Sequence, residues 1–188
     1  MKMRIAFSLM LLLALLFSGC KPPVAHDPSL WKELVVAEGD FKITMPPDAK
    51  RETQTIPRHS GSGSVDTVEY RSSGIDCYYL VGWLDLRPGS GYDFETAMNA
   101  TAKQLGGKVA DKNEVKVDEY PGVEFSMTVT RPDDGNAVER LVHVKAPEKN
   151  VNRAYWIRAC GTNVDKSDQD VRKFLDSFEL TLPKPSSK

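Results

Sequence analysis

Histidine is scarce in this 188-residue chain, which limits the metal and acid–base chemistry that the chain can offer. His26, His59 and His143 lie far apart, and none belongs to an HExxH pair, the spacing that puts two imidazoles on one helix face for zinc. No serine stands in a GxSxG turn, which exposes the nucleophile of α/β-hydrolases. We interpret all three as surface histidines; a hydrolase would need His59 or His143 beside a nucleophile and a carboxylate.

A cluster of aspartates, Asp165, Asp168 and Asp170, suggests either calcium binding or the cap of a helix. An EF-hand loop needs glycine at its sixth position, and counting from Asp165 that position holds Asp170. Because carboxylates at a helix N-terminus complement the helix dipole, we favour capping, with Ser167 as the N-cap. Two Gly-Ser-Gly segments do not continue into a phosphate-binding GxGxxG or GxxxxGKS motif. We therefore expect no metal and no cofactor.

The overall charge is close to neutral. The chain carries 25 Lys and Arg against 26 Asp and Glu, a formal net charge of −1. Nucleic-acid binding needs a basic face that displaces counterions, so this balance argues against it. Hydrophobic residues make up 40% and charged residues 27%, which is typical of a globular domain.

The first nineteen residues differ in composition from the rest. Lys2 and Arg4 precede an apolar run that extends from Ile5 to Phe17. A membrane-spanning helix needs roughly 20 apolar residues, so this run is too short to span. Its basic start and short apolar centre predict a signal peptide over residues 1–19.

The end of this segment, LFSGC, resembles the lipobox of bacterial lipoproteins, with Phe17 where the family usually has leucine. The resemblance implies cleavage before Cys20, a diacylglycerol on its thiol and a lasting membrane anchor. Lys21 rather than aspartate follows, which in lipoproteins of Gram-negative rods implies the outer membrane, facing the periplasm. The alternative is an ordinary secretory signal with an incidental cysteine.

Two further cysteines, Cys77 and Cys160, remain once Cys20 is assigned to the lipid. Disulfides persist in exported domains, so we predict a bond between this pair. The alternative is two separately buried thiols, because a free cysteine packs like a small apolar residue. Without a CxxC spacing or nearby histidines, the pair does not predict a zinc site.

The rest of the chain predicts one α+β domain over residues 30–182, between a lipidated cysteine with its linker at 20–29 and a disordered tail at 183–188. Alternating or continuous apolar runs predict a series of strands: 34–45 as a hairpin, 49–56, 64–72, 75–86, 123–129, 137–146 and 154–160. Apolar residues at helical spacing predict two helices, 93–105 and 168–178. Strands in runs with inserted helices favour an antiparallel β-sheet flanked by two helices.

Aromatic residues are concentrated on two of these strands, at Tyr78, Tyr79, Trp83, Tyr155 and Trp156. Neighbouring residues of a strand point to opposite faces, so each adjacent pair directs one ring outward unless a helix covers it. An outward row of rings would suit a partner protein, whereas a sheet covered on both faces would bury them all as core.

The segments FKITMPPDA and DVRKFLDSFEL, with a helix in mid-chain and a hairpin-rich second half, resemble PsbP-like domains. The resemblance implies an α-β-α sandwich around an antiparallel sheet. Some members of this family are extrinsic subunits of the oxygen-evolving complex, and many bacterial relatives are lipoproteins of unknown role. No ligand or metal residues carry over to this chain.

These features lead us to expect a membrane-anchored envelope lipoprotein that is not an enzyme and acts through contacts with an envelope protein. A small-ligand-binding lipoprotein is the alternative, and it requires a concave apolar pocket with a few polar groups. An unrecognised hydrolase is a third possibility. The oligomeric state stays open.

Overall fold

The computed structural model describes residues 27–57, 64–74, 76–130, 134–147 and 150–182. The predictions for the signal peptide, Cys20, His26, His59 and the tail fall outside these residues. Within the described part, no helix is long and apolar enough to cross a bilayer.

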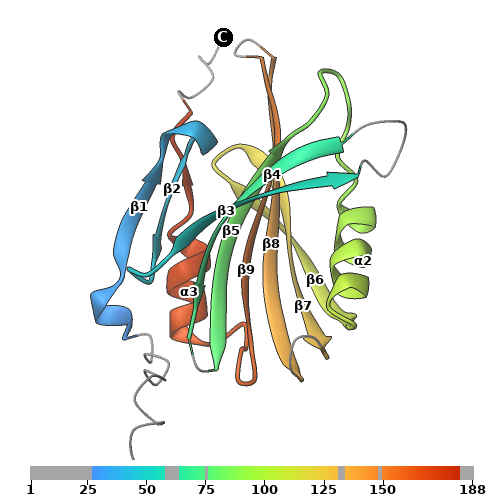
Figure 1. Cartoon of the computed structure of the whole chain (residues 1–188). Coiled ribbons are helices and arrows are strands. Elements are labelled where there is room, and N and C mark those ends of the chain that lie inside the picture. Colours follow the sequence, from blue (N-terminus) through green and yellow to red (C-terminus); the bar gives the residue numbers. More distant parts are fainter. Residues whose placement is uncertain (1–26, 58–63, 75, 131–133, 148–149, 183–188) are drawn as a thin grey trace, which may run out of the picture.

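Ten strands and two α-helices make up the described part of the chain (Figure 1). The helices are α2 (Phe94–Gln104) and α3 (Gln169–Asp176). The strands are β1 (Lys32–Val36), β2 (Phe41–Met45), β3 (Lys50–Pro57), β4 (Ser64–Ser73), β5 (Cys77–Asp85), β6 (Lys108–Val117), β7 (Tyr120–Val129), β8 (Gly135–Ala146), β9 (Val151–Gly161) and β10 (Glu179–Leu180).

The strands form two antiparallel sheets. The larger sheet has the order β3-β4-β5-β9-β8-β7-β6, and the smaller sheet has the order β1-β2-β10. In Figure 1, α2 lies on one side of the large sheet, while α3 and the small sheet lie on the other. This arrangement confirms the predicted α+β class with an antiparallel sheet flanked by helices.

One core fills the space between the large sheet, α3 and the small sheet. Phe41 and Ile43 of β2, Tyr155 of β9 and Phe174 of α3 are all fully buried there. The predicted hairpin over 34–45 is confirmed by the antiparallel pairing of β1 and β2, and β2 alternates, with its odd-numbered residues buried and its even-numbered ones half-buried. Tyr155 Oη also donates to the Gly39 carbonyl at 2.8 Å, which joins the β1–β2 connection to the large sheet.

A second core lies under α2. Phe125 and Met127 of β7 point toward Met98 and Ala102 of the helix, and all four side chains are at most 5% exposed. The predicted strand over 123–129 is thereby confirmed, and it begins three residues earlier, at Tyr120. Asp93, the N-cap of α2, accepts backbone hydrogen bonds from Glu95 and Thr96.

The predicted disulfide is wrong, because Cys77 and Cys160 are free thiols. They lie on neighbouring strands, but Cys77 is opposite Gly161 and Cys160 is opposite Tyr78. This offset of one residue sends the two side chains to opposite faces of the sheet. Cys77 packs against the α3 core and Cys160 belongs to the α2 core, so the sheet itself separates the two sulfurs.

Two smaller expectations also change. The N-cap of α3 is Asp168, whose carboxylate accepts from the backbone of Asp170 and Val171, rather than Ser167. The end of the linker predicted at 20–29 belongs to the folded domain, since Pro28–Leu30 form a short 3-10 turn whose first carbonyl accepts a hydrogen bond from Lys173 Nζ at 2.6 Å.

Candidate functional site

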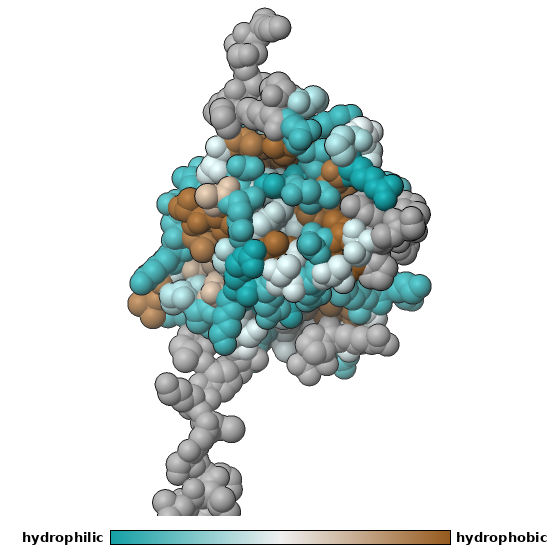
Figure 2. Space-filling view, turned by 45° about the horizontal axis from the view of Figure 1, so that its top comes forward, coloured by the Kyte–Doolittle hydropathy of each residue, from teal (hydrophilic) through white to brown (hydrophobic). Residues whose placement is uncertain are grey.

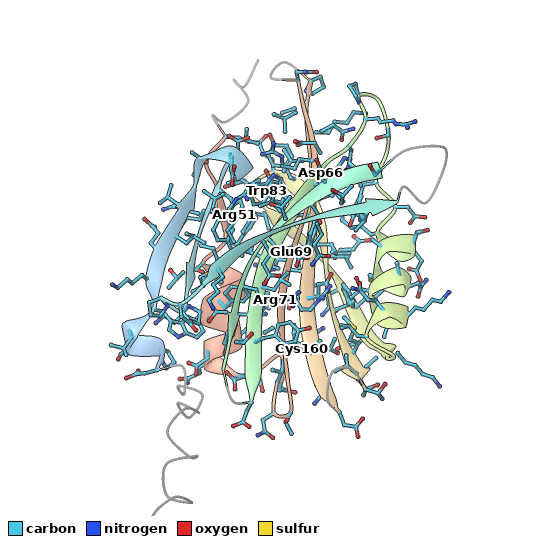
Figure 3. All side chains as sticks on the ribbon, viewed as in Figure 1. Arg51, Asp66, Glu69, Arg71, Trp83 and Cys160 are labelled. Atoms are coloured by element: carbon cyan, nitrogen blue, oxygen red, sulfur yellow. The ribbon has the colours of Figure 1, made fainter. Side chains whose placement is uncertain are left out.

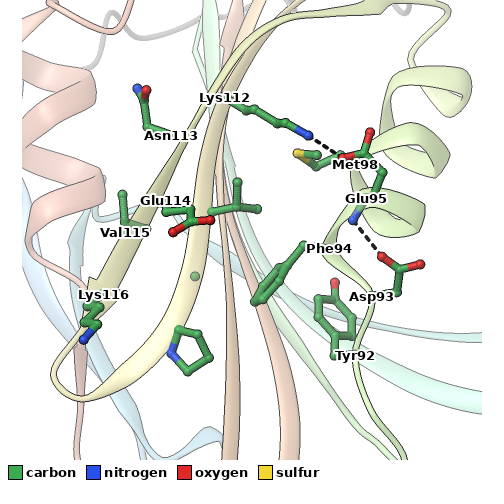
Figure 4. Close-up of a pocket in the computed structure, with 13 residues that line it drawn as sticks. Tyr92, Asp93, Phe94, Glu95, Met98, Lys112, Asn113, Glu114, Val115 and Lys116 are labelled. Atoms are coloured by element: carbon green, nitrogen blue, oxygen red, sulfur yellow. Dashed lines mark hydrogen bonds and ion pairs between the residues drawn. The ribbon is translucent and has the colours of Figure 1, made fainter.

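A groove of about 940 Å³ opens between the first turns of α2 and strands β6 and β7 (Figure 4). The lining comes from three parts of the chain. These are residues 92–95 with 98 on α2 and the loop before it, residues 112–116 on β6, and residues 121–123 on β7. The groove lies on the α2 side of the large sheet, close to the edge that β6 forms.

The floor of the groove is apolar. Met98 and Val123 are buried at 2% and 6% exposure, and Phe94 is half-buried beside them. Tyr92 meets Phe94 edge to face, with ring centroids 5.3 Å apart. Burial raises the pKa of Tyr92 well above its ordinary value, so its phenol stays neutral. The floor therefore offers aromatic and aliphatic contact without charge.

The rim of the groove is charged. The Glu95 carboxylate forms an ion pair with Lys112 across the opening (Figure 4). Asp93 is occupied as the helix cap, and the hydrogen bond from the Thr96 hydroxyl is the largest cause of its lowered pKa. Glu114 and Lys116 make no ion pair with another described residue, so one carboxylate and one ammonium remain available to a bound molecule.

Further along the same face of the sheet lies a polar cluster. Glu139 is fully buried and pairs with the Arg158 guanidinium directly across from it, while the Thr101 hydroxyl of α2 donates to Glu139 at 3.4 Å. Arg71 covers the ring of Tyr78, with its guanidinium carbon 5.7 Å from the centroid. Glu139 is thus neutralised by Arg158 and held by a second element.

The indole of Trp156 lies on the same face and is held from two sides. Its Nε1 donates to Glu69 of β4 at 3.1 Å. A Cβ added to Gly82 would lie only 2.6 Å from the indole ring, so the absence of a side chain there lets Trp156 lie flat on β5. Figure 3 places Glu69 and Arg71 in succession along β4, with Cys160 below them.

The predicted aromatic row is therefore divided between the two faces. Tyr79, Trp83 and Tyr155 are core residues on the α3 side, at most 5% exposed. Tyr78 and Trp156 point to the α2 side and stay half-buried.

The thiols and phenols of this region are poorly suited to nucleophilic attack. Burial raises the pKa of Tyr78 to about 12 and that of Cys77 to about 11, and it also raises the pKa of Cys160. Because the thiolate is the reactive form of cysteine, a thiol held neutral by an apolar environment is inert.

His143, a candidate from the sequence, is engaged in holding a loop. Its Nε2 lies 2.8 Å from Asn152 Oδ1, and the Asn152 amide donates to the carbonyls of Arg87 and Ser90. The ring also packs against Tyr92 at 5.7 Å between centroids. Among the described residues, its hydrogen-bond partner is an amide rather than the carboxylate or nucleophile that a hydrolase would require.

The aspartate cluster behaves as a set of local caps. Asp168 caps α3, and Asp165 accepts from the backbone and hydroxyl of Ser167. In the part of the chain that the structure describes, no group of three potential metal ligands comes together.

The groove itself was not predicted from the sequence. Its wall β6 falls in a stretch, Lys108–Val117, dominated by charged residues that gave no strand prediction. A weak signal was present, since Val115 and Val117 alternate with Glu114 and Lys116.

Comparisons with known proteins do not identify a family for this chain. No family model matches this chain, and no match was found among curated protein sequences. A similar solved structure is that of a protein of unknown function, PA94 from Pseudomonas aeruginosa, at 12% identity over 71% of this chain and 83% of that chain, with a TM-score of 0.32. A score this low supports no inference about function or fold, and the PsbP-like resemblance stays a prediction.

Proposed function

We propose that this chain is a lipid-anchored envelope protein that binds an amphipathic ligand in the groove between α2 and β6–β7, without catalysing a reaction. The observation that carries the proposal is the groove, which combines an apolar floor with two charged side chains on its rim, Glu114 and Lys116, that have no ion-pair partner among the described residues. A concave apolar site with few polar groups is the usual form of a small-molecule site.

The kind of ligand follows from the two parts of the groove. Phe94, Met98 and Val123 suit an alkyl or aromatic portion, which gains about 25 cal/mol for each Å² of apolar surface that leaves water. Glu114 and Lys116 suit a polar end that carries one or both charges. The proposed ligand therefore has an apolar body and a polar or zwitterionic end.

The lipid anchor in this proposal rests on the resemblance of the sequence around Cys20 to a lipobox. The segment that follows is held against α3, because Trp31 packs edge-on against Tyr79 with centroids 4.8 Å apart and Lys173 lies over its ring. This attachment is on the α3 side of the large sheet, whereas the groove is on the α2 side (Figure 1). Both can therefore operate at once.

Binding can be tested with N-phenyl-1-naphthylamine, a neutral apolar dye that fluoresces strongly out of water. We expect saturable binding to the full chain in detergent-free nanodiscs, measured above the non-saturable signal of empty nanodiscs, and at least fivefold weaker binding to Phe94→Ala. The matched control is Ile56→Ala, which removes an exposed apolar side chain on β3, outside the groove. Equal binding by wild type and Phe94→Ala would contradict the groove as the site.

The anchor requires a separate measurement. Mass spectrometry of the membrane fraction should find an acylated N-terminal peptide that begins at Cys20, and Cys20→Ala should release the chain from the membrane. An unmodified chain that begins elsewhere would overturn the anchor without affecting the dye experiment.

Contact with an envelope protein is a second candidate function. The half-buried Tyr78 and Trp156, with Arg71 over the former, favour it because these three residue types are enriched in protein interfaces. A photoreactive residue in place of Arg71 should then crosslink one defined protein, whereas the same residue in place of Lys50, exposed on β3, should not.

A further inference from the structure

The outer edge of β6 is open for pairing. β6 is the last strand of the large sheet, and within the described residues it pairs only with β7. Seven of its ten residues are exposed, Val109 and Val115 are half-buried, and only Val117 is buried. An edge strand presents unpaired backbone N–H and C=O groups, so it is a natural site for a further strand.

A β-bulge limits which part of β6 can pair. The register with β7 shifts between Val109 and Asp111. Bulges bend a strand and interrupt its ladder, so a partner strand can follow only the regular part beyond it. The usable segment is therefore Lys112–Val117, the same half that borders the groove.

We propose that β6 of one copy of this chain pairs antiparallel with β6 of a second copy, with Val115 opposite Val115 at the two-fold axis. This register places Glu114 opposite Lys116 of the second copy, and the symmetry repeats that pair. Lys112 is not needed for this register, because it already pairs with Glu95 of its own copy. Residues directly opposite in such a ladder have Cβ atoms about 5 Å apart, close enough for each opposite-charge pair to attract.

The charges select this register over its neighbours. If the two-fold axis passed through Glu114, that residue would lie opposite Glu114 of the second copy, and Lys112 would lie opposite Lys116. Both kinds of pair are repulsive. A two-fold at Asn113 would require residues 109–111 to pair, and these contain the bulge. Only the Val115 register combines opposite charges with a regular strand.

Glu114 and Lys116, the two charged residues beside the proposed axis, are available for pairing between copies. Glu114 and Lys116 have no ion-pair partner among the described residues, and both side chains are exposed. Charged edge residues normally discourage edge-to-edge pairing. Here their order along the strand is self-complementary, as a symmetric dimer requires of its interface.

The pairing would also complete the groove. Figure 4 shows Lys112 and Glu114 on the groove side of β6, with Asn113 and Val115 directed away. A second strand beyond β6 would lie along the open side of the groove. Glu114 of one copy would then pair with Lys116 of the other at the rim, so a ligand would meet these two charges as a pair in the dimer and as separate charges in the monomer. The dimer does not rest on the proposed ligand, and its test needs no ligand.

Crosslinking of the full chain in intact membranes tests the dimer. With Val115→Cys, mild oxidation should give a covalent dimer, because the two new thiols face each other at the axis. Of the native cysteines, Cys77 and Cys160 are at least partly buried and carry raised pKa values, and Cys20 is present equally in the control variant below, which reports any crosslink through it. The matched control is Thr53→Cys on β3, the opposite edge of the sheet, which should stay monomeric.

Charge reversal then tests the register. Adding Lys116→Glu to Val115→Cys should reduce the covalent dimer about tenfold, because both central pairs become repulsive. Adding Glu114→Lys as well restores opposite charges and should restore the dimer. No dimer with Val115→Cys, equal crosslinking by Thr53→Cys, or a loss that Glu114→Lys does not reverse would each overturn the proposal.

Discussion

At the scale of single residues, the two cysteines show how one position along a strand decides the chemistry. A shift of Cys160 by one residue would have put both sulfurs on one face of the sheet. We predict that alkylation of the unfolded, unreduced protein labels both Cys77 and Cys160, and that a reductant leaves the unfolding midpoint unchanged. A linked Cys77–Cys160 peptide in the unreduced sample would contradict the structure.

Gly82 is a residue whose lack of a side chain matters. Because an added Cβ would lie 2.6 Å from the indole of Trp156, we expect Gly82→Ala to lower the free energy of unfolding by about 1–3 kcal/mol. Tryptophan fluorescence should change as the ring is displaced. Gly91→Ala is the control, since nothing lies within 4 Å of the Cβ that it adds. Equal urea midpoints for the two variants would show that the contact is unimportant.

The buried ion pair gives a third prediction. Glu139→Ala leaves the Arg158 guanidinium, 8% exposed, without its counter-charge, and should cost about 3–5 kcal/mol of unfolding free energy. Replacing both residues by methionine should cost less than the single change, because no charge is then stranded. Glu95→Ala, which breaks the exposed pair with Lys112, should cost at most about 1 kcal/mol. Chemical denaturation of the wild type, the two single variants and the double variant measures the unfolding free energy of each and so gives their order.

At the scale of elements, a charge cluster holds α3 on the sheet. Glu124 of β7 accepts hydrogen bonds from Arg140 of β8 at 2.7 Å and from Arg172 of α3 at 2.9 Å. Arg140 also donates to the Leu175 carbonyl and to Asp176 at the end of α3. Three elements therefore meet at one carboxylate that is 5% exposed.

This cluster makes stability depend on pH in a known direction. Burial by itself would raise the pKa of Glu124, but the hydrogen bonds from Arg172 and Arg140 outweigh it and lower the pKa below its ordinary value of 4.5. A carboxyl with a lowered folded pKa stabilises fully above its unfolded pKa and loses that contribution as pH falls through the folded value.

We therefore expect the free energy of unfolding to fall as the pH drops below about 4.5. In Glu124→Gln this part of the decrease should be missing, while the variant should already be less stable at pH 7. Urea denaturation between pH 3 and 7 measures both. Parallel pH curves for the two proteins would contradict the role of Glu124.

The elements differ in how far the sequence could predict them. β2 and α3 have one buried face each, and β7 has an apolar face although Glu124 is buried on its other face. The apolar periodicity of all three therefore gave their positions within a few residues. β6 was missed because most of its residues are exposed, so its apolar alternation is confined to Val115 and Val117 at its end. β10 was missed because two residues are too short for any pattern.

At the scale of the whole molecule, periodicity indicated an antiparallel sheet with two helices but did not give the strand order. That order puts β9 between β5 and β8, and it brings α2 against β6 and β7. The groove depends on these long-range neighbours, so its lining from three separate segments could not be read from local spacing. The Cys77–Cys160 error has the same origin, because register is a property of paired strands.

The exposed large hydrophobic residues of the described part of the chain are scattered and lie away from the groove. On the face seen in Figure 2, hydrophobic residues form separate patches among hydrophilic ones. The large hydrophobic residues that are strongly exposed, Leu30, Val35 and Ile56, belong to η2 (Pro28–Leu30), β1 and β3, away from the groove.

The most direct test of the groove as the binding site is hydrogen–deuterium exchange of the full chain with and without N-phenyl-1-naphthylamine. We predict that the dye slows exchange in residues 92–98 and 112–123, and leaves the backbone of β3 and β4 unchanged. Slower exchange in β3 and β4, or no change in any segment under saturating dye, would contradict the assignment of the groove.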